Sequence, residues 1–457
     1  MKIVKNLVLF LMVIICVFLS SQVWLKLPDF LSLNHEDDKL VNEEIDINIW
    51  NVVKPNKYIL RKNNSFKEFY LKDDIDFWQK VVANLEIALK NFSDSQFSII
   101  GGELYPEEYV MLDFENRLPL EIFTGEFGLS KDHIKTKLNY IDKIVIGLNE
   151  SNSIYIHDGE TTVIIKNSSI NNKEIYDSLN SVNDYVEYIQ NIEVEGETIP
   201  IPIPNIKYAL NPVFVKSELD VKNKTAIESI AKEYFKNNFD YVRRSEDIEG
   251  DILYVYKNEK VLKISSEGLL DFFDSNINID NNSNVYESLL TALKFAMNFL
   301  TFPDDMYLSE VKVTQSDGSF GYEFVFTYRI QNKPILFSKI RESAALEVKV
   351  IGNNVVSYKR LIRDLDTKQD SEMKEEKILS FEEVLKKQIS ITDESSKSNT
   401  LMVIDKSMVK DIDNVYLAYF DYARITKEQH LIVVWVVEIK GDIYIFNAIT
   451  GSVIEAP

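Results

Sequence analysis

The chain of 457 residues contains one cysteine, Cys16, and four histidines. A single thiol cannot close an intramolecular disulfide, and the polar remainder of the chain has no thiol to act as a metal ligand or nucleophile. The histidines are far apart, and none has a second ligand at the spacing of a zinc site; they are His35, His133, His157 and His430. The sequence therefore predicts no metal site and no cofactor.

Other signatures of catalysis are scarce. Neither of the usual glycine-rich nucleotide-binding loops occurs. Ser407 and Lys410 have the Ser-x-x-Lys spacing of penicillin-binding enzymes, but the Ser-x-Asn and Lys-Thr-Gly motifs that accompany it there are missing. We therefore predict no catalytic residues and expect that the protein is not an enzyme.

Positively charged residues are fewer than negatively charged ones, and the formal net charge is −21. Nucleic acids and anionic lipid headgroups would both repel such a chain, so neither is an expected partner. The acidic excess has two readings, general solubility and an acidic docking face, and the sequence favours the first.

The chain has one long apolar run, from Leu7 to Leu25, which follows Lys2 and Lys5. As a helix it would be about 28 Å long, close to the thickness of the hydrocarbon layer. The positive residues before it predict a cytoplasmic tail at residues 1–6, a transmembrane anchor at 7–25, a stalk at 26–45 and an extracytoplasmic remainder. A cleaved signal peptide is the alternative, but bulky residues occupy the positions before the possible cleavage sites.

Two small side chains, Cys16 and Ser20, lie four residues apart in this segment. On a helix they would share one face, where a partner helix could approach closely. A lone anchor surrounded by lipid is the alternative. We name Cys16 and Ser20 as the candidate transmembrane contact face.

Hydrophobic periodicity divides the remainder into three parts. An N-terminal α+β domain, 46–215, is predicted to have helices at 74–90 and 173–189, strands at 97–100, 109–114, 143–148, 153–157 and 161–165, a turn at Asp158-Gly159 and an extended connector at 199–204. A central α+β domain, 216–304, begins with a capping box at Thr225 and Glu228. Strands are expected there at 239–243, 252–256 and 261–264, and a helix at 285–300.

The C-terminal domain, 305–457, is predicted to be rich in strands. We expect them at 307–314, 322–330, 335–338, 345–351, 355–361, 415–420, 431–439 and 442–447. A second capping box, Ser380 and Glu383, begins a short helix, and the run at 431–439 is apolar enough to be buried on both faces. Helices packed on antiparallel sheets define an α+β fold class.

Three segments of this domain resemble the strand pairs of PepSY-like modules. They are Phe326-Thr-Tyr-Arg-Ile-Gln-Asn-Lys-Pro-Ile335, Leu346-Glu-Val-Lys-Val-Ile-Gly-Asn-Asn-Val355-Val-Ser-Tyr358, and Val434-Trp435 leading to Tyr444-Ile-Phe-Asn-Ala-Ile-Thr-Gly451. With the N-terminal anchor ending in Gln22-Val-Trp24, the helix near Thr225 and the chain length, the whole resembles the YycH family, whose smaller relatives are the YycI proteins.

The resemblance implies a single-pass membrane regulator without catalytic residues. Such a protein would act with a sister YycI-like regulator on a sensor histidine kinase that controls cell-wall metabolism in Gram-positive bacteria, largely through its membrane helix. Two alternatives stay open: a PepSY-type module that binds or inhibits a peptidase or a wall ligand, and a cell-wall hydrolase whose site is assembled from distant residues.

Overall fold

The computed structural model describes residues 47–457, apart from short segments at 70–74, 93–94, 131–137, 151, 180–184, 195–196, 200, 207–212, 276–283, 304, 317–318, 339–343, 367–376, 396–403, 405 and 423–428. The predicted tail, anchor and stalk, with Cys16 and Ser20, lie outside the described residues. Within the described part, no helix is long and apolar enough to cross a membrane.

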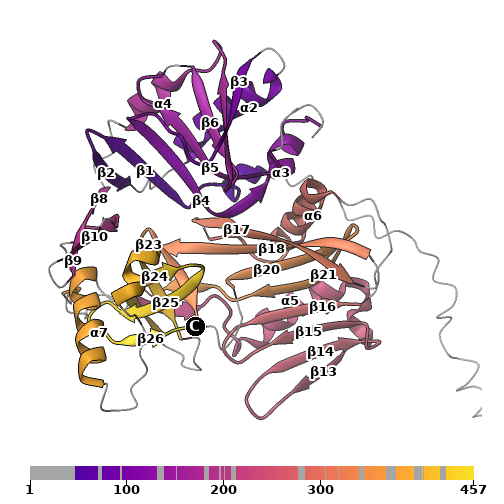
Figure 1. Ribbon diagram of the computed structural model, residues 1–457. Coiled ribbons are helices and arrows are strands. Elements are labelled where there is room, and N and C mark those ends of the chain that lie inside the picture. The colour runs from indigo at the N-terminus through magenta and orange to yellow at the C-terminus, as the bar shows by residue number, and fades with distance from the viewer. Residues whose placement is uncertain are drawn as a thin grey trace, which may run out of the picture. The chain divides into compact units, whose positions relative to one another are not determined.

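The first sheet is antiparallel and has nine strands (Figure 1). Their order is β11 (Ile203–Pro204), β8 (Tyr185–Ile189), β2 (Ser65–Phe69), β1 (Lys57–Lys62), β4 (Tyr109–Pro119), β5 (Tyr140–Gly147), β6 (Ser153–His157), β7 (Thr161–Lys166) and β3 (Gln96–Gly101). A short ribbon of β9 (Ile192–Val194) and β10 (Glu197–Ile199) follows β8. All five strands predicted in this part between 97 and 165 are present, within a few residues of the expected bounds.

One face of the first sheet packs against helix α2 (Ile75–Lys90), with α4 (Asn172–Leu179) beside that helix. The predicted apolar stripe of α2 is buried, and Trp78 within it donates its indole N–H to the Val53 carbonyl at 2.9 Å. A third helix, α3 (Leu120–Glu126), follows β4 directly. The periodicity of residues 74–90 thus predicted this helix and its buried face correctly.

The helix predicted at 173–189 is wrong over its second half. The helical part ends at Leu179, and residues 185–189 form β8, which pairs with β2. Along β8, Tyr185 is exposed while Val186 is buried, the alternation of a half-buried strand. Aromatic and β-branched side chains fit a sheet edge, and pairing with β2 outweighed the helical pattern.

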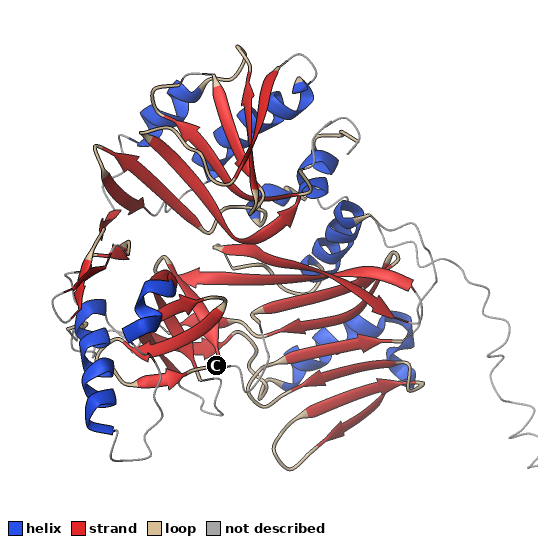
Figure 2. Ribbon diagram, viewed as in Figure 1, coloured by secondary structure: helices blue, strands red, loops and turns tan. Residues whose placement is uncertain are grey.

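The second sheet has fifteen strands and is formed by residues after Pro204, together with helices drawn in blue in Figure 2. One part consists of β13 (Arg243–Glu246), β14 (Ile252–Tyr256), β15 (Lys260–Ile264), β16 (Leu270–Asp274), β21 (Asn354–Arg360), β20 (Leu346–Ile351), β18 (Ser319–Ile330) and β17 (Met306–Ser316). The other consists of β19 (Lys333–Phe337), β23 (Ile412–Asp421), β24 (Gln429–Ile439), β12 (Val213–Ser217), β22 (Arg363–Leu365), β25 (Asp442–Asn447) and β26 (Val453–Glu455).

Two helices belong to the first part of this sheet, α5 (Lys224–Phe235) and α6 (Val285–Met297), and α6 packs on β18, β20 and β21. The cap predicted for α5 is wrong. Asn223 caps this helix by accepting the Ala226 N–H at 3.2 Å, while Glu228 pairs with Lys232 one turn later. Asn is as good an N-cap as Thr, and its earlier position moves the start of the helix by two residues.

The strand predicted at 239–243 is also wrong, because residues 236–241 form a 3-10 helix, η4 (Lys236–Tyr241). Phe239 is the apolar anchor of this turn: it packs on the core and its ring lies 6.3 Å from that of Tyr254. The strand next to β14 is instead β13, whose residues are all exposed. Strand β16 was not predicted.

At the C-terminal end, β24 is buried on both faces, as predicted. Trp435 and the other odd-numbered residues contribute to the main core, whereas Val434 and Val436 pack in a second cluster with Ala418 and Phe420. Helix α7 (Phe381–Ser395) lies over the first of these faces, where Phe381 contacts the Trp435 ring at 5.9 Å.

The second predicted capping box is confirmed at the start of α7. The Glu383 amide donates to the Ser380 hydroxyl at 3.2 Å, and the Ser380 amide donates to the Glu383 carboxylate at 2.7 Å. A further short 3-10 helix, η7 (Lys406–Asp411), precedes β23.

Two buried arginines connect the parts of the second sheet. The Arg360 guanidinium forms a bidentate pair with Glu218, at 2.6 and 2.8 Å, and also donates to the Thr301 carbonyl. Arg363 pairs with Asp421 at 3.1 Å and donates to the Glu267 carbonyl, between β15 and β16, at 2.9 Å. The side chains of Arg363 and Asp421 are almost inaccessible to solvent. Removing one partner of such a buried pair destabilises the folded state, because the remaining charge is desolvated without a compensating interaction.

The fold class is α+β, as expected, with helices on sheets that are antiparallel apart from the parallel pair of β19 and β23. Residues Ile47–Pro457 form one compact unit by their contacts, and the change from the first to the second sheet falls between Pro204 and Val213. The division into domains at 46–215, 216–304 and 305–457 stays a prediction.

Replacing Ser380 by Ala should remove one half of the capping box at α7. We expect a loss of about 1 kcal/mol in the free energy of unfolding, measured by urea denaturation. Ser229→Ala is the matched control, since its hydroxyl only bonds the Thr225 carbonyl within α5 and alanine is a better helix former. Equal losses for the two variants would contradict the capping role.

Replacing Asp421 by Asn should leave the buried Arg363 charge without its counter-ion. The expected loss is about 3–5 kcal/mol in the free energy of unfolding. A double variant, Arg363→Met with Asp421→Leu, should recover most of this loss because it removes both charges. If the double variant is less stable than Asp421→Asn, the ion pair is not the cause.

Candidate functional site

The face of the first sheet opposite α2 carries a row of polar side chains from four adjacent strands. Lys57 of β1 lies opposite Asp113 of β4, Asp113 opposite Lys143 of β5, and Lys143 opposite His157 of β6. Directly opposed residues of antiparallel strands point to the same face. The register therefore places Asp113 between two lysines on this face, with His157 at the end of the row.

Asp113 is the residue of this row whose side chain lacks a hydrogen bond from the described chain. Its carboxylate is half-buried. Burial raises the pKa of Asp113 to about 6, although Lys57 and Lys143 oppose this shift. The carboxylate is therefore mostly ionised at neutral pH, although burial disfavours its charged form.

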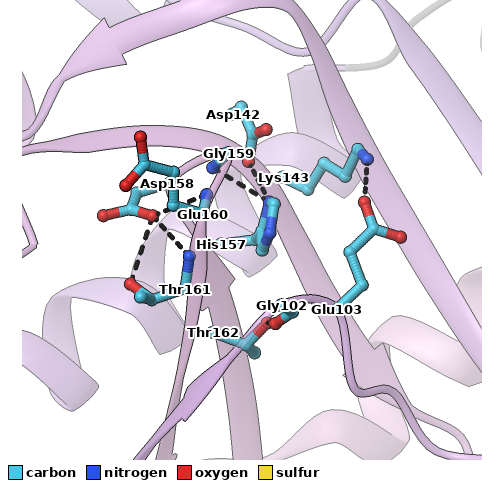
Figure 3. A network of polar contacts seen from close by, with 10 residues as sticks. All are labelled: Gly102, Glu103, Asp142, Lys143, His157, Asp158, Gly159, Glu160, Thr161 and Thr162. Atoms are coloured by element: carbon cyan, nitrogen blue, oxygen red, sulfur yellow. Dashed lines mark hydrogen bonds and ion pairs between the residues drawn. The ribbon is translucent and has the colours of Figure 1, made fainter.

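The two lysines that flank Asp113 are engaged elsewhere. Lys57 donates to the Asn414 side-chain oxygen of β23 at 3.2 Å, and its ammonium group lies 4.7 Å from the Tyr416 ring centroid. Lys143 pairs with Glu103, in the loop after β3 (Figure 3). Both cations thus reduce the negative potential near Asp113 without forming a short contact with it.

His157 and Asp142 form a contact beside this row. The distance from His157 Nδ1 to the Asp142 carboxylate is 2.8 Å, and the Gly159 amide lies 3.1 Å from the same nitrogen. Nδ1 cannot both donate to Asp142 and accept from Gly159, and the shorter contact, with the carboxylate oxygen, assigns the proton to Nδ1. Thr162, opposite His157 on β7, donates its hydroxyl to the Gly102 carbonyl instead. His157 thus lies directly before the turn at Asp158-Gly159 and bonds Asp142.

The predicted turn after His157 is confirmed. Asp158 accepts hydrogen bonds from the amides of Glu160 and Thr161, at 3.0 and 2.8 Å, as Figure 3 shows. Gly159 has a φ of +93°, a conformation that side chains disfavour, which explains glycine at this position. The turn fixes the end of β6 and with it the position of His157.

A second group of contacts lies where β4 meets β17 and β18. Tyr307 donates its hydroxyl to Glu115 at 2.9 Å, and the Arg329 guanidinium stacks on the Tyr307 ring at 4.3 Å. Arg329 also pairs with Asp305 at 3.0 Å and donates to the side-chain oxygen of Asn56, just before β1, at 3.1 Å. Glu115 is accessible, yet desolvation by the surrounding protein raises its pKa despite the bond from Tyr307.

Members of both groups line a cleft with a volume of about 680 Å³. Its lining contains five carboxylates and three cationic side chains: Asp113, Glu115, Asp142, Asp413 and Glu438, with Lys57, Arg117 and Lys143. The uncharged part of the lining is Ile59, Phe66, Met111, Phe114, Asn116, Tyr188, Gln190, Pro202 and Asn414. A volume of this size is typical of sites that bind small molecules or short peptide segments.

The residues considered from the sequence lie elsewhere. Ser407 and Lys410 are exposed on η7, and His430 lies at the start of β24, where its ring contacts Phe214 at 6.1 Å. Across the described segments, no three His, Cys, Asp or Glu side chains are grouped as a metal site would require. The cleft residues were missed. The one available signal was Asp113 itself, a carboxylate within the apolar strand pattern of residues 109–114.

Known proteins place the chain in context. A family model described as the YycH protein N-terminal domain matches residues 2–186. No curated protein sequence matches the chain.

Among solved structures, YycH from Bacillus subtilis aligns with a TM-score of 0.50 and 16% identity, over 87% of this chain and 96% of that chain. An uncharacterized protein from Eubacterium rectale aligns with a TM-score of 0.35 and 16% identity, over 59% of this chain and 94% of its own. At 16% identity, a structural match shows similarity of fold and no more. The N-terminal part of the chain, residues 2–186, is thus similar to the YycH N-terminal domain family, and the chain shares the fold of Bacillus subtilis YycH.

Proposed function

We propose that the protein is a membrane-anchored, extracytoplasmic regulator without catalytic activity, acting on the sensor histidine kinase of a two-component system that controls the cell wall. Similarity to the YycH family supports a role in regulating a two-component system in general. The family match is the observation that carries the proposal. It begins at residue 2 and therefore includes the predicted anchor at residues 7–25.

The anchor is the proposed contact with the kinase. In this arrangement residues 1–6 are cytoplasmic, the helix at 7–25 packs against the kinase helices through Cys16 and Ser20, and the remainder of the chain is extracytoplasmic. Small side chains allow the close backbone approach that stabilises helix pairs in lipid. A sister YycI-like regulator is the second proposed partner.

The extracytoplasmic part would bias the kinase between its signalling states. Such a bias requires that the regulator bind one state more tightly than the other, since equal affinities shift no equilibrium. The cleft on the first sheet is a place where a bound ligand could alter this difference in affinity.

One alternative function has some support. A PepSY-type module that binds a wall ligand or inhibits a peptidase needs a concave site, and the cleft of about 680 Å³ provides one. The alternative of a cell-wall hydrolase has less support. In the described chain, no hydroxyl nucleophile is hydrogen-bonded to the pair of His157 and Asp142, and the nearby Thr162 hydroxyl donates to the Gly102 carbonyl. Loss of wall-degrading activity on replacing His157 would reverse this ranking.

The proposal predicts that the full-length protein recovers a sensor histidine kinase when purified from membranes in mild detergent. Cys16→Leu with Ser20→Leu should reduce this recovery several-fold, because larger side chains prevent close packing. Quantitative mass spectrometry of the purified complexes gives the measurement.

The matched control is Ile14→Leu with Phe18→Leu, which introduces the same two leucines on the opposite side of the predicted helix. Recovery should be unchanged in this variant. If full-length protein and a version with an unrelated anchor recover equal amounts of kinase, the anchor is not the contact. If neither recovers a kinase, the proposed function is wrong.

A further inference from the structure

The cleft contains hydrogen-bond acceptors that the protein itself does not use. The Asp113 carboxylate accepts no hydrogen bond from the described chain. Asn116 and Gln190 donate their amide hydrogens to the carbonyls of Ser309 and Asn64, but their own side-chain oxygens accept nothing from described residues. The unused groups are thus acceptors, and they suit a ligand that donates hydrogen bonds.

The electrostatics of the lining favour a cation. Carboxylates outnumber cationic side chains by five to three. Two of the three cationic side chains already interact with other residues: Lys57 donates to Asn414, and Lys143 pairs with Glu103. A positive ligand near Asp113 would replace some of the solvation that the carboxylate loses on folding.

The remaining wall is apolar, with Ile59, Phe66, Met111 and Pro202 in the lining. An ammonium group alone would leave this surface uncovered. An aliphatic stem attached to the ammonium group would bury it and gain hydrophobic free energy in proportion to the covered area. The combination matches the amphipathic chemistry of a lysine side chain or an alkyl diamine.

We propose that this cleft binds a primary ammonium group on an aliphatic stem, with Asp113 as its anionic partner. Asn116 and Gln190 offer acceptors to further N–H groups of the ligand. The site is independent of the anchor, and the proposed kinase contact does not require it.

The chain contains a matched control for Asp113. Asp271 of β16 also lies between two lysines of adjacent strands, Lys263 and Lys359, and burial likewise raises its pKa. Its carboxylate also accepts no hydrogen bond from the described chain. Asp271 does not line the cleft. The two aspartates therefore share the position between two lysines of adjacent strands, and only Asp113 lies in the proposed ligand site.

The test uses the full-length protein in detergent and isothermal titration calorimetry at pH 7.5. The probes are acetyl-Leu-Lys-Leu-amide, the same peptide with norleucine in place of lysine, and 1,5-diaminopentane. We expect the lysine peptide or the diamine to bind at least tenfold more tightly than the norleucine peptide. Asp113→Asn should weaken that binding at least tenfold, and Asp271→Asn should leave it unchanged.

The two amine probes distinguish a polypeptide source of the ammonium group from a small free amine. Tighter binding of the peptide indicates a polypeptide ligand, and tighter binding of the diamine indicates a small amine. The proposal is overturned if neither amine binds, if norleucine binds as well as lysine, or if Asp113→Asn binds as the unaltered protein does. Kinase recovery through the anchor would be unaffected by any of these outcomes.

Binding should also depend on pH through Asp113. The charged groups facing it are Lys57 on β1, Glu115 on β4, Asp142 and Lys143 on β5, Glu103 after β3, and Asp413 and Glu438 on β23 and β24. With a pKa of about 6, most Asp113 carboxylates are protonated at pH 5, and the apparent affinity should be about tenfold lower than at pH 7.5. The Asp113→Asn variant should show no such change; an equal pH dependence would assign the effect to another group.

Stability without ligand tests whether the variant folds. Because the folded-state pKa of Asp113 is raised, the folded protein binds more protons than the unfolded chain between about pH 4 and 6. Its contribution to stability therefore falls as the pH rises through this window and stays lost at pH 7.5. Asp113→Asn should then be the more stable protein at pH 7.5 in thermal denaturation, and the difference should vanish below about pH 4.

Discussion

The register of three antiparallel strands is the constraint on which the cleft depends. Lys57, Asp113 and Lys143 lie directly opposite one another on β1, β4 and β5. A slip of one residue would turn Asp113 toward α2, where a carboxylate would meet only apolar side chains. The buried residues that alternate with the row, such as Leu112 and Ile144, prevent this slip. The hydrophobic core of the first sheet thereby determines which charges face the cleft.

Contacts around Arg329 hold two sides of the cleft together. This guanidinium reaches Asp305 and Asn56 and stacks on Tyr307, whose hydroxyl bonds Glu115. In a desolvated setting such a network is stronger than separate pairs on the surface, and losing one member leaves the others unsatisfied. The position of β4 relative to β17 and β18 is therefore fixed by directional bonds as well as by packing. An acceptor-rich site benefits from this rigidity, since ordering its groups on binding costs little.

The proposed regulator has two separate working parts. The apolar segment at residues 7–25 is the proposed contact with the kinase, and the cleft is the proposed ligand site. A ligand in the cleft would influence the kinase only if it bound one state of the complex more tightly than the other, and the kinase would then change the affinity for the ligand by the same factor. This reciprocity joins the two proposals without making either depend on the other.

Apolar alternation and helical periodicity predicted most elements, including β6 and α2, because these patterns reflect local geometry. The errors at residues 185–189 and 239–243 arose where sheet pairing or an aromatic anchor outweighed the local pattern. The sequence by itself determined the apolar segment at 7–25, the lack of thiols beyond Cys16 and the α+β class. Only the tertiary structure brought Asp113 together with Lys57, Lys143 and Asn414, because strand register and the approach of β23 come from contacts between residues far apart in the chain.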